Sequence, residues 1–214
     1  MNRLAAMLAA VLAFPASAFS IATAFSSPCH EPLTAAAFSR SRAAFPADQI
    51  PPPPTALERK LSEDFAKNYG PADTPPEYLF AQMSLIMGVR APDTDGHSLL
   101  DLDNTRILHT VPHDQYAHAL RGAEDDGEAG NTQVAIGTRE TIHQLMTQAR
   151  DALGKPRDEQ YETVTYDIDG YGLLDVQVWA PAYYAGRAAH ALQDSFSHAL
   201  RVDDFHRVAH FFNY

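Results

Sequence analysis

The stretch from residue 190 to residue 198, HALQDSFSH, places His190, Asp194 and His198 four residues apart. Because an α-helix turns about 100° per residue, side chains at this spacing lie on one helical face. Imidazole and carboxylate groups bind zinc, and burying them without a partner costs free energy. The spacing therefore indicates either a metal site or a hydrogen bond between His190 and Asp194, with His198 at the surface.

The chain contains ten histidines and one cysteine, Cys29. A single cysteine excludes an internal disulfide framework. Nitrogen and oxygen ligands without cysteine pairs are typical of catalytic zinc sites, whereas structural zinc sites usually contain thiolates. The composition therefore favours a catalytic metal centre over a structural one.

Several of these residues occur in an order that resembles the superfamily of zinc-dependent phospholipases C and single-strand-specific zinc nucleases. His190 and Asp194 match its central His-x-x-x-Asp motif. Its isolated upstream ligands correspond to His30, Asp93 and His109. The resemblance covers most of the mature chain, and it implies an all-helical domain in which two or three zinc ions promote the hydrolysis of phosphate esters.

The same resemblance implies a role for each matched residue. His190 would bind zinc, and Asp194 would bridge two zinc ions. Asp93, in the segment APDT, would be both a ligand and the catalytic residue that orients or deprotonates the attacking water. His109, sixteen residues further on, would share that zinc ion, and Asp95 is the alternative to Asp93 for the same role.

His30 matches the early histidine of the superfamily, which binds another zinc ion together with the amine and carbonyl of the mature first residue. If the leader is cut after Ala24, that residue is Phe25, five positions before His30. A cut after Ala18 would instead leave Phe19 first. Phe25 is therefore a backbone ligand only after the first of these cleavages.

The last zinc ion of the superfamily takes a histidine after the bridging aspartate, and then a His-x-x-x-Glu or His-x-x-x-Asp motif. His198 fills the first place and His210 the second, but a tyrosine occupies the position of the final carboxylate. Either Asp203 or Asp204 supplies the missing oxygen, or His206 and His210 both bind the ion.

The elements that position these residues are predicted to be mostly helical, in one all-α domain with long loops. The resemblance implies the fold of the phospholipase C and zinc nuclease superfamily. Residues 161–166 alternate as in a strand, but no partner strand is evident, so a loop or a short edge strand is expected. His118 is expected at the surface, with a supporting contact to the metal site as the alternative. Predicted helices cover residues 55–70, 78–87, 116–120, 133–153, 181–200 and 203–214.

Residues 1–24 are predicted to be a signal peptide, because a short basic start precedes an apolar run and Ala-x-Ala sites that allow cleavage after residue 18 or 24. The apolar run is too short to span a bilayer, and no second run of membrane length follows. The mature domain, residues 25–214, is therefore expected to be secreted or periplasmic, monomeric and without a transmembrane segment.

The formal charge of −11 disfavours a stable complex with nucleic acid. Among the activities that the resemblance implies, we therefore expect a phospholipase C-type phosphodiesterase acting on phospholipid head groups ahead of a nuclease or nucleotidase. The missing carboxylate after His210 favours a second class, a non-catalytic helical protein stabilised by metal. A third class is an exported protein that scavenges zinc through its histidines.

Overall fold

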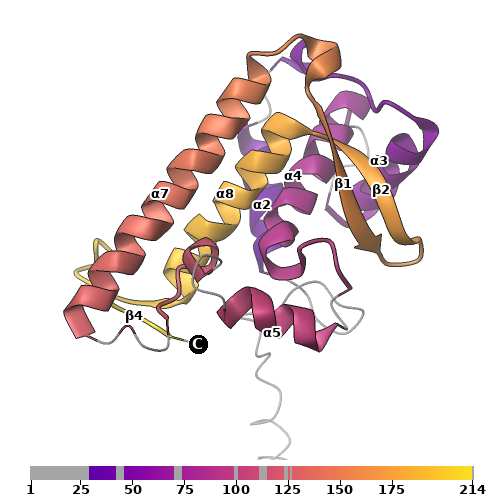
Figure 1. Cartoon of the computed structure of the whole chain (residues 1–214). Coiled ribbons are helices and arrows are strands. Elements are labelled where there is room, and N and C mark those ends of the chain that lie inside the picture. The colour runs from indigo at the N-terminus through magenta and orange to yellow at the C-terminus, as the bar shows by residue number, and fades with distance from the viewer. Residues whose placement is uncertain are drawn as a thin grey trace, which may run out of the picture.

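The structure is a computed structural model that describes residues 29–41, 46–69, 74–98, 101–110, 115–122, 125 and 127–213. The predicted signal peptide, Phe25 and Tyr214 lie outside these residues. The described residues form six longer helices, three short 3-10 helices and two β-hairpins, and Figure 1 shows how they are arranged. They are α2 (His30–Ser41), η2 (Ala47–Gln49), α3 (Ala56–Tyr69), α4 (Pro76–Thr94), α5 (Leu102–Thr110), η3 (Tyr116–His118), α7 (Gly127–Leu153), η4 (Arg157–Glu159), β1 (Tyr161–Ile168), β2 (Gly172–Trp179), α8 (Ala180–Ser197), β3 (Ala199–Val202) and β4 (Arg207–Phe211).

Helices α4 and α8 pack against each other at the centre of the molecule. A Cβ atom added to Gly88 of α4 would lie 2.1 Å from the carbonyl oxygen of Tyr183. A Cβ atom added to Gly186 of α8 would lie 2.1 Å from the carbonyl oxygen of Leu85. Non-bonded atoms do not approach so closely, so both positions require glycine. This contact brings the second half of α8, which carries His190, beside the end of α4.

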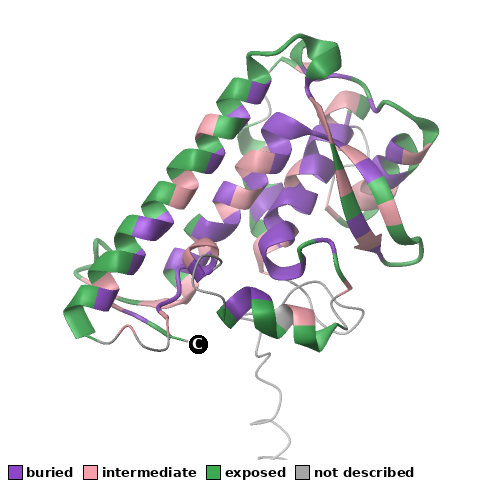
Figure 2. Cartoon of the chain, in the orientation of Figure 1, coloured by how far each residue is buried: buried purple, intermediate pink, exposed green. Residues whose placement is uncertain are grey.

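Buried residues gather where α4 and α8 meet, and the outer face of α7 is mostly exposed (Figure 2). Phe80, Met83 and Met87 of α4 join Val176 and Val178 of β2 in the main apolar cluster. Among the described residues, none of the helices combines the length and the hydropathy needed to cross a bilayer.

Helix α4 is longer than the sequence pattern predicts. The predicted helix over residues 78–87 is confirmed, but α4 continues through Pro92 to Thr94. Asp95 ends it with a left-handed backbone conformation, φ 45°. Asp93 therefore lies in the last helical turn rather than in a loop.

Residues 161–166 belong to an edge strand, which is one of the two expected outcomes, but the expectation that they lack a partner strand is wrong, because β1 is paired along its whole length. Strands β1 and β2 are antiparallel and paired from Tyr161 and Trp179 to Ile168 and Gly172. The partner strand is half-buried against the core, so its apolar residues do not alternate strictly along its whole length. The predicted, mostly helical fold is confirmed, and two small two-stranded sheets accompany the helices.

The C-terminal helix predicted over residues 203–214 is also wrong. Helix α8 ends at Ser197, and β3 and β4 then form a hairpin. Three consecutive residues at its turn, Asp203, Asp204 and Phe205, have φ values of 55°, 52° and 69°. Right-handed helices exclude such φ values, so the chain reverses direction where the sequence favours a helix start.

Candidate metal centre

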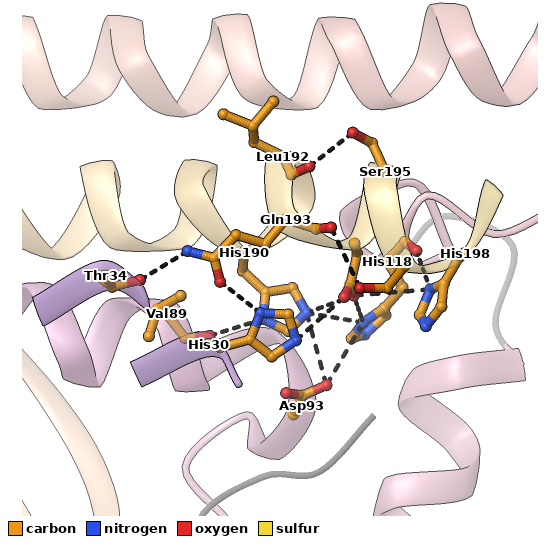
Figure 3. Close-up of polar contacts among 12 residues, drawn as sticks. His30, Thr34, Val89, Asp93, His118, His190, Leu192, Gln193, Ser195 and His198 are labelled. Atoms are coloured by element: carbon orange, nitrogen blue, oxygen red, sulfur yellow. Dashed lines mark hydrogen bonds and ion pairs between the residues drawn. The ribbon is translucent and has the colours of Figure 1, made fainter. Parts of the chain in front are cut away.

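Four histidines and two aspartates meet between the ends of several helices. Figure 3 shows His30, His118, His190 and Asp93 of this set pointing toward one another. They come from the first residue of α2, the last turn of α4, the last turn of α5, the end of η3 and the second half of α8. All except His30 are buried, and the side chain of His30 is 13% exposed. The cluster consists of His30, Asp93, His109, His118, His190 and Asp194.

The carboxylate of Asp194 faces different histidines with its two oxygens. Its Oδ1 lies 3.2 Å from Nε2 of His30. Its Oδ2 lies 2.9 Å from Nε2 of His190 and 3.2 Å from Nδ1 of His118. The side chain therefore stands between two sets of imidazole nitrogens, as a bridging carboxylate does.

Asp93 completes the cluster from the side of α4. Its Oδ1 lies 3.6 Å from Nε2 of His190, 3.6 Å from Nδ1 of His118 and 3.4 Å from Nε2 of His109. Zinc ligands at about 2.0–2.1 Å lie about 3.3 Å from one another in a tetrahedron. The observed separations fit that arrangement, and two groups of three ligands are close enough to hold an ion: one contains His30, His190 and Asp194, and the other Asp93, His118 and His190.

Hydrogen bonds from Nδ1 of His190 and of His30 determine that Nε2 of each ring faces the cluster. Nδ1 of His190 donates to the carbonyl oxygen of Val89 at 2.7 Å, because a carbonyl can only accept. Nδ1 of His30 donates at 2.6 Å to Oε1 of Gln193, whose Nε2 donates to Oγ1 of Thr34 at 2.8 Å. In both neutral rings the lone pair is therefore on Nε2, which points at the carboxylates. Metal-binding histidines are held in this way.

Lone pairs and carboxylate oxygens that face one another repel, so the cluster needs a proton or a metal cation at its centre. Burial opposes a charge on His190, but the negative charges of Asp93 and Asp194 outweigh burial and raise its pKa to about 9. Burial likewise opposes ionisation of Asp194, yet His190 and the hydrogen bonds from His118, His190 and His30 lower the pKa of this carboxyl well below its usual range. The residues present therefore fit a metal ion, which would replace the proton of His190.

His118 is the ligand candidate that the sequence missed. The prediction that it lies at the surface is wrong, since it is 1% exposed and its Nδ1 contacts both aspartates. Its buried Nε2 has no hydrogen-bond partner among the described residues. Its position depends on the turn between α5 and α7, so neither periodicity nor motif spacing identifies it.

Two predicted ligands, His198 and His210, form hydrogen bonds to other groups and lie outside the two groups of metal ligands. His210 is on β4, and its Nε2 accepts a hydrogen bond from Nη2 of Arg121 at 3.1 Å. His198 follows the last residue of α8, and its Nδ1 donates to the carbonyl oxygen of His118 at 2.6 Å. That nitrogen is 3.9 Å from Oδ2 of Asp194. Neither residue belongs to the two groups that can hold an ion, and Phe25 lies outside the described residues.

The remaining alternatives also separate in space. Asp95 is exposed at the end of α4, so Asp93 and not Asp95 faces the histidines. Asp203 and Asp204 are exposed in the β3–β4 turn, and His206 follows them there.

Comparison of the chain with protein-family models, with curated proteins and with solved structures finds no match. The resemblance to the phospholipase C and zinc nuclease superfamily therefore stays a prediction.

Proposed function

We propose that the protein is an exported zinc-dependent hydrolase of phosphate esters. The observation that carries the proposal is the placement of Asp194 between two sets of imidazole nitrogens, with Oδ1 facing His30 and Oδ2 facing His190 and His118. Hydrolases of phosphate esters commonly use two ions about 3.5–4 Å apart, and a bridging carboxylate sets such a separation.

The two oxygens of Asp194 allow the residues to be divided between two ions, with His190, which belongs to both groups, given to the second. His30 and Oδ1 of Asp194 would hold one ion, while Oδ2 of Asp194, His190, His118 and Asp93 would hold the other. Bound zinc would supply a Lewis acid that lowers the pKa of a water molecule and neutralises charge on the phosphate. The chain's own residues fix the positions of these partners.

Asp93 is the residue proposed to orient the attacking water. Burial opposes its ionisation, but His190, His109 and His118 outweigh burial and lower its pKa. An ionised carboxylate with a low pKa accepts a hydrogen bond from water but is a weak base. Asp93 would therefore orient the attacking water more than deprotonate it.

Two side chains of the cluster are partly exposed among the described residues, which supports access for water or substrate. The side chains of His190 and His118 are 0% and 1% exposed, whereas those of His30 and His109 are 13% and 11% exposed. An accessible edge is a requirement of catalytic zinc sites, because an open position has to receive water or substrate. Solvent access at this edge therefore supports catalysis over a purely structural role.

Phospholipid-type phosphodiesters are the proposed substrates. The net charge of −11 opposes the approach of a long polyanion and affects a substrate with a single phosphate much less. A nuclease or nucleotidase activity at the same site is the alternative within this class.

A second candidate function is a non-catalytic helical protein that zinc stabilises. The contact between His210 and Arg121 favours it, because that histidine is then engaged away from the cluster and a third ion lacks one of its expected ligands.

Metal analysis of the mature protein, purified without chelator and assayed on a simple phosphodiester and on phosphatidylcholine, tests the proposal. Two or three zinc ions per chain with turnover support the enzyme. Zinc without turnover on either substrate supports the non-catalytic protein, and a chain that binds no zinc contradicts both.

A further inference from the structure

A cavity of about 410 Å³ lies beside the first half of α8, away from the metal centre. It is bordered by α2, α4, the C-terminal half of α7 and the start of α8, and none of its described lining residues belongs to the histidine and aspartate cluster. Figure 1 shows α7 lying along α8 at this level. The cavity is therefore a separate site on the same helix.

Small side chains on the two facing helices leave this space open. Ala149 of α7 and Ala182 and Ala185 of α8 line it where larger residues would normally fill the contact. Trp179, the only tryptophan in the chain, lines it as well. Met146, at the side of α7, is about half exposed. Apolar side chains thus remain in contact with solvent, which is unfavourable unless a ligand covers them.

The lining excludes polar ligands from the interior of the cavity. The indole N–H of Trp179 already donates to Gln160, and the hydroxyl of Ser41 donates to the carbonyl oxygen of Phe38. A sugar, nucleotide or peptide inside would therefore leave its own polar groups without partners, at a cost of several kcal/mol. A hydrocarbon chain has none to satisfy.

The volume of the cavity and the charge at its border restrict the class of ligand further. A methylene group occupies about 27 Å³, a little less than one water molecule in the liquid, so the volume corresponds to a chain of about fifteen carbons. Arg150 lines the cavity, and its Nε and Nη2 donate to Oδ1 of Asp151, an exposed neighbour on the same helix. No contact of the described residues engages its Nη1, so this nitrogen is the one that can face a head group. None of the described lining residues is acidic, although the chain carries a charge of −11. The Arg150 guanidinium therefore favours an anionic head group.

We infer that this cavity binds one acyl chain of a single-chain anionic amphiphile, with the chain against Trp179 and the head group near Arg150. The head group is a carboxylate or a phosphate, since both pair with a guanidinium.

Quenching of Trp179 fluorescence tests the inference directly, because bromine quenches indole only near contact. Dibrominated stearate should quench the emission of the mature protein with a saturable 1:1 profile. Ordinary stearate should compete without quenching. Absence of saturable quenching, or of competition by stearate, would overturn the inference even without any variant.

Variants then locate the ligand. Ala185→Phe fills the cavity and should weaken binding by at least about tenfold, because the acyl chain then loses the burial of about two methylene groups. Ala56→Phe, at an exposed position of α3, is the matched control and should bind as the wild type. Zinc content and phosphodiester turnover should not change in Ala185→Phe, which separates this site from the proposed active site. Unaltered affinity in a folded Ala185→Phe protein would contradict the assignment.

The head group is tested with matched probes. Arg150→Gln should weaken the brominated acid about threefold, as expected for a largely exposed pair. The brominated methyl ester should bind more weakly than the acid to the wild type and equally to both proteins. A brominated alkyl phosphate distinguishes the two anions by which of them binds more tightly. Methyl ester binding as tight as that of both anions would overturn the anionic assignment.

Discussion

The two ends of α8 differ in what they bury. Toward its C-terminus, His190 and Asp194 bring polar groups into the interior, and each is held by named partners from other helices. Toward its N-terminus, Ala182 and Ala185 leave an apolar space that no side chain of the described residues fills. The C-terminal end gathers buried imidazole and carboxylate groups that need a shared cation, and the N-terminal end leaves apolar side chains in contact with solvent. We infer that both are completed by ligands, a metal ion at the first and a hydrocarbon chain at the second.

The largest expected effect is at the polar end. Asp194→Asn keeps the shape of the side chain but removes the charge and one oxygen that faces the histidines. We expect zinc affinity to fall by more than about 100-fold, since loss of a supporting contact alone costs 10–100-fold, and phosphodiester turnover to disappear. Zinc competition with a chelator and the phosphodiester assay measure the two effects. Asp169→Asn, exposed in the β1–β2 turn, is the control. Wild-type affinity and turnover in Asp194→Asn would show that this carboxylate does not bridge metal.

The helix contact between the two ends is the next most sensitive feature. Gly88→Ala places a methyl group against the backbone of Tyr183, so we expect the free energy of unfolding to fall by about 2–3 kcal/mol. Because α4 then shifts relative to α8, zinc affinity should fall as well. Gly154→Ala is the control, since its new Cβ would meet other atoms only at 3.5 Å or more. Urea unfolding compares the two. Equal stability would mean that α4 and α8 do not approach as closely as the structure places them.

The metal-free polar end should also be sensitive to pH. The pKa of His190 is raised to about 9 in the folded protein, against 6.5 in the unfolded chain, so its protonated form contributes stability below about pH 6.5. That stability is lost as the pH rises toward 9, by up to about 3 kcal/mol for this group. Urea unfolding in the presence of a chelator at pH 6.5 and pH 9 measures the change. Zinc should remove the fall, because it takes the place of the proton. A metal-free protein that is more stable at pH 9 would contradict the charge assigned to His190.

Substitutions of Gln193 test whether its hydrogen bond to His30 orients that ring for metal binding. Gln193→Leu removes the acceptor for Nδ1 of His30, so that ring can turn, and zinc affinity should drop about 10–100-fold. Gln193→Glu keeps an oxygen acceptor and should restore most of the affinity. Gln144→Leu, exposed on α7, should have no effect. Equal affinities for the leucine and glutamate variants would mean that the hydrogen bond to His30 has no role in metal binding.

The smallest effect is expected at the apolar end. Overpacking a filled core costs about 1–3 kcal/mol, but Ala185→Phe enters existing space, so stability should change by less than about 1 kcal/mol. Thermal unfolding of the ligand-free protein measures it. A loss of several kcal/mol would show that the cavity is closed in solution.

The same contrast explains what the sequence reveals. The 190, 194 and 198 spacing is local, so helix geometry alone places His190 and Asp194 on one face and the structure bears this out. His118 reaches the cluster only because the turn before α7 is folded against α8, which no local pattern encodes. The cavity is a set of missing atoms contributed by four helices, so no residue type in the sequence indicates it.

The two errors in secondary structure have physical causes as well. The second strand of the β1–β2 hairpin lacks strict alternation because one of its ends is buried on both sides. At the C-terminus, three consecutive residues other than glycine have positive φ, which is uncommon for residues with a Cβ atom, so no sequence pattern indicates this turn. His210 consequently lies on a strand beside Arg121 and not on the helix that the spacing predicts.

Zinc located by anomalous diffraction in crystals of the zinc-loaded protein tests the central claim most directly. We predict one ion within about 2.0–2.2 Å of each oxygen of Asp194, the first also bound by Nε2 of His30 and the second by Nε2 of His190. Zinc found only at exposed histidines such as His97 or His143, with the Asp194 cluster free of metal, would contradict it.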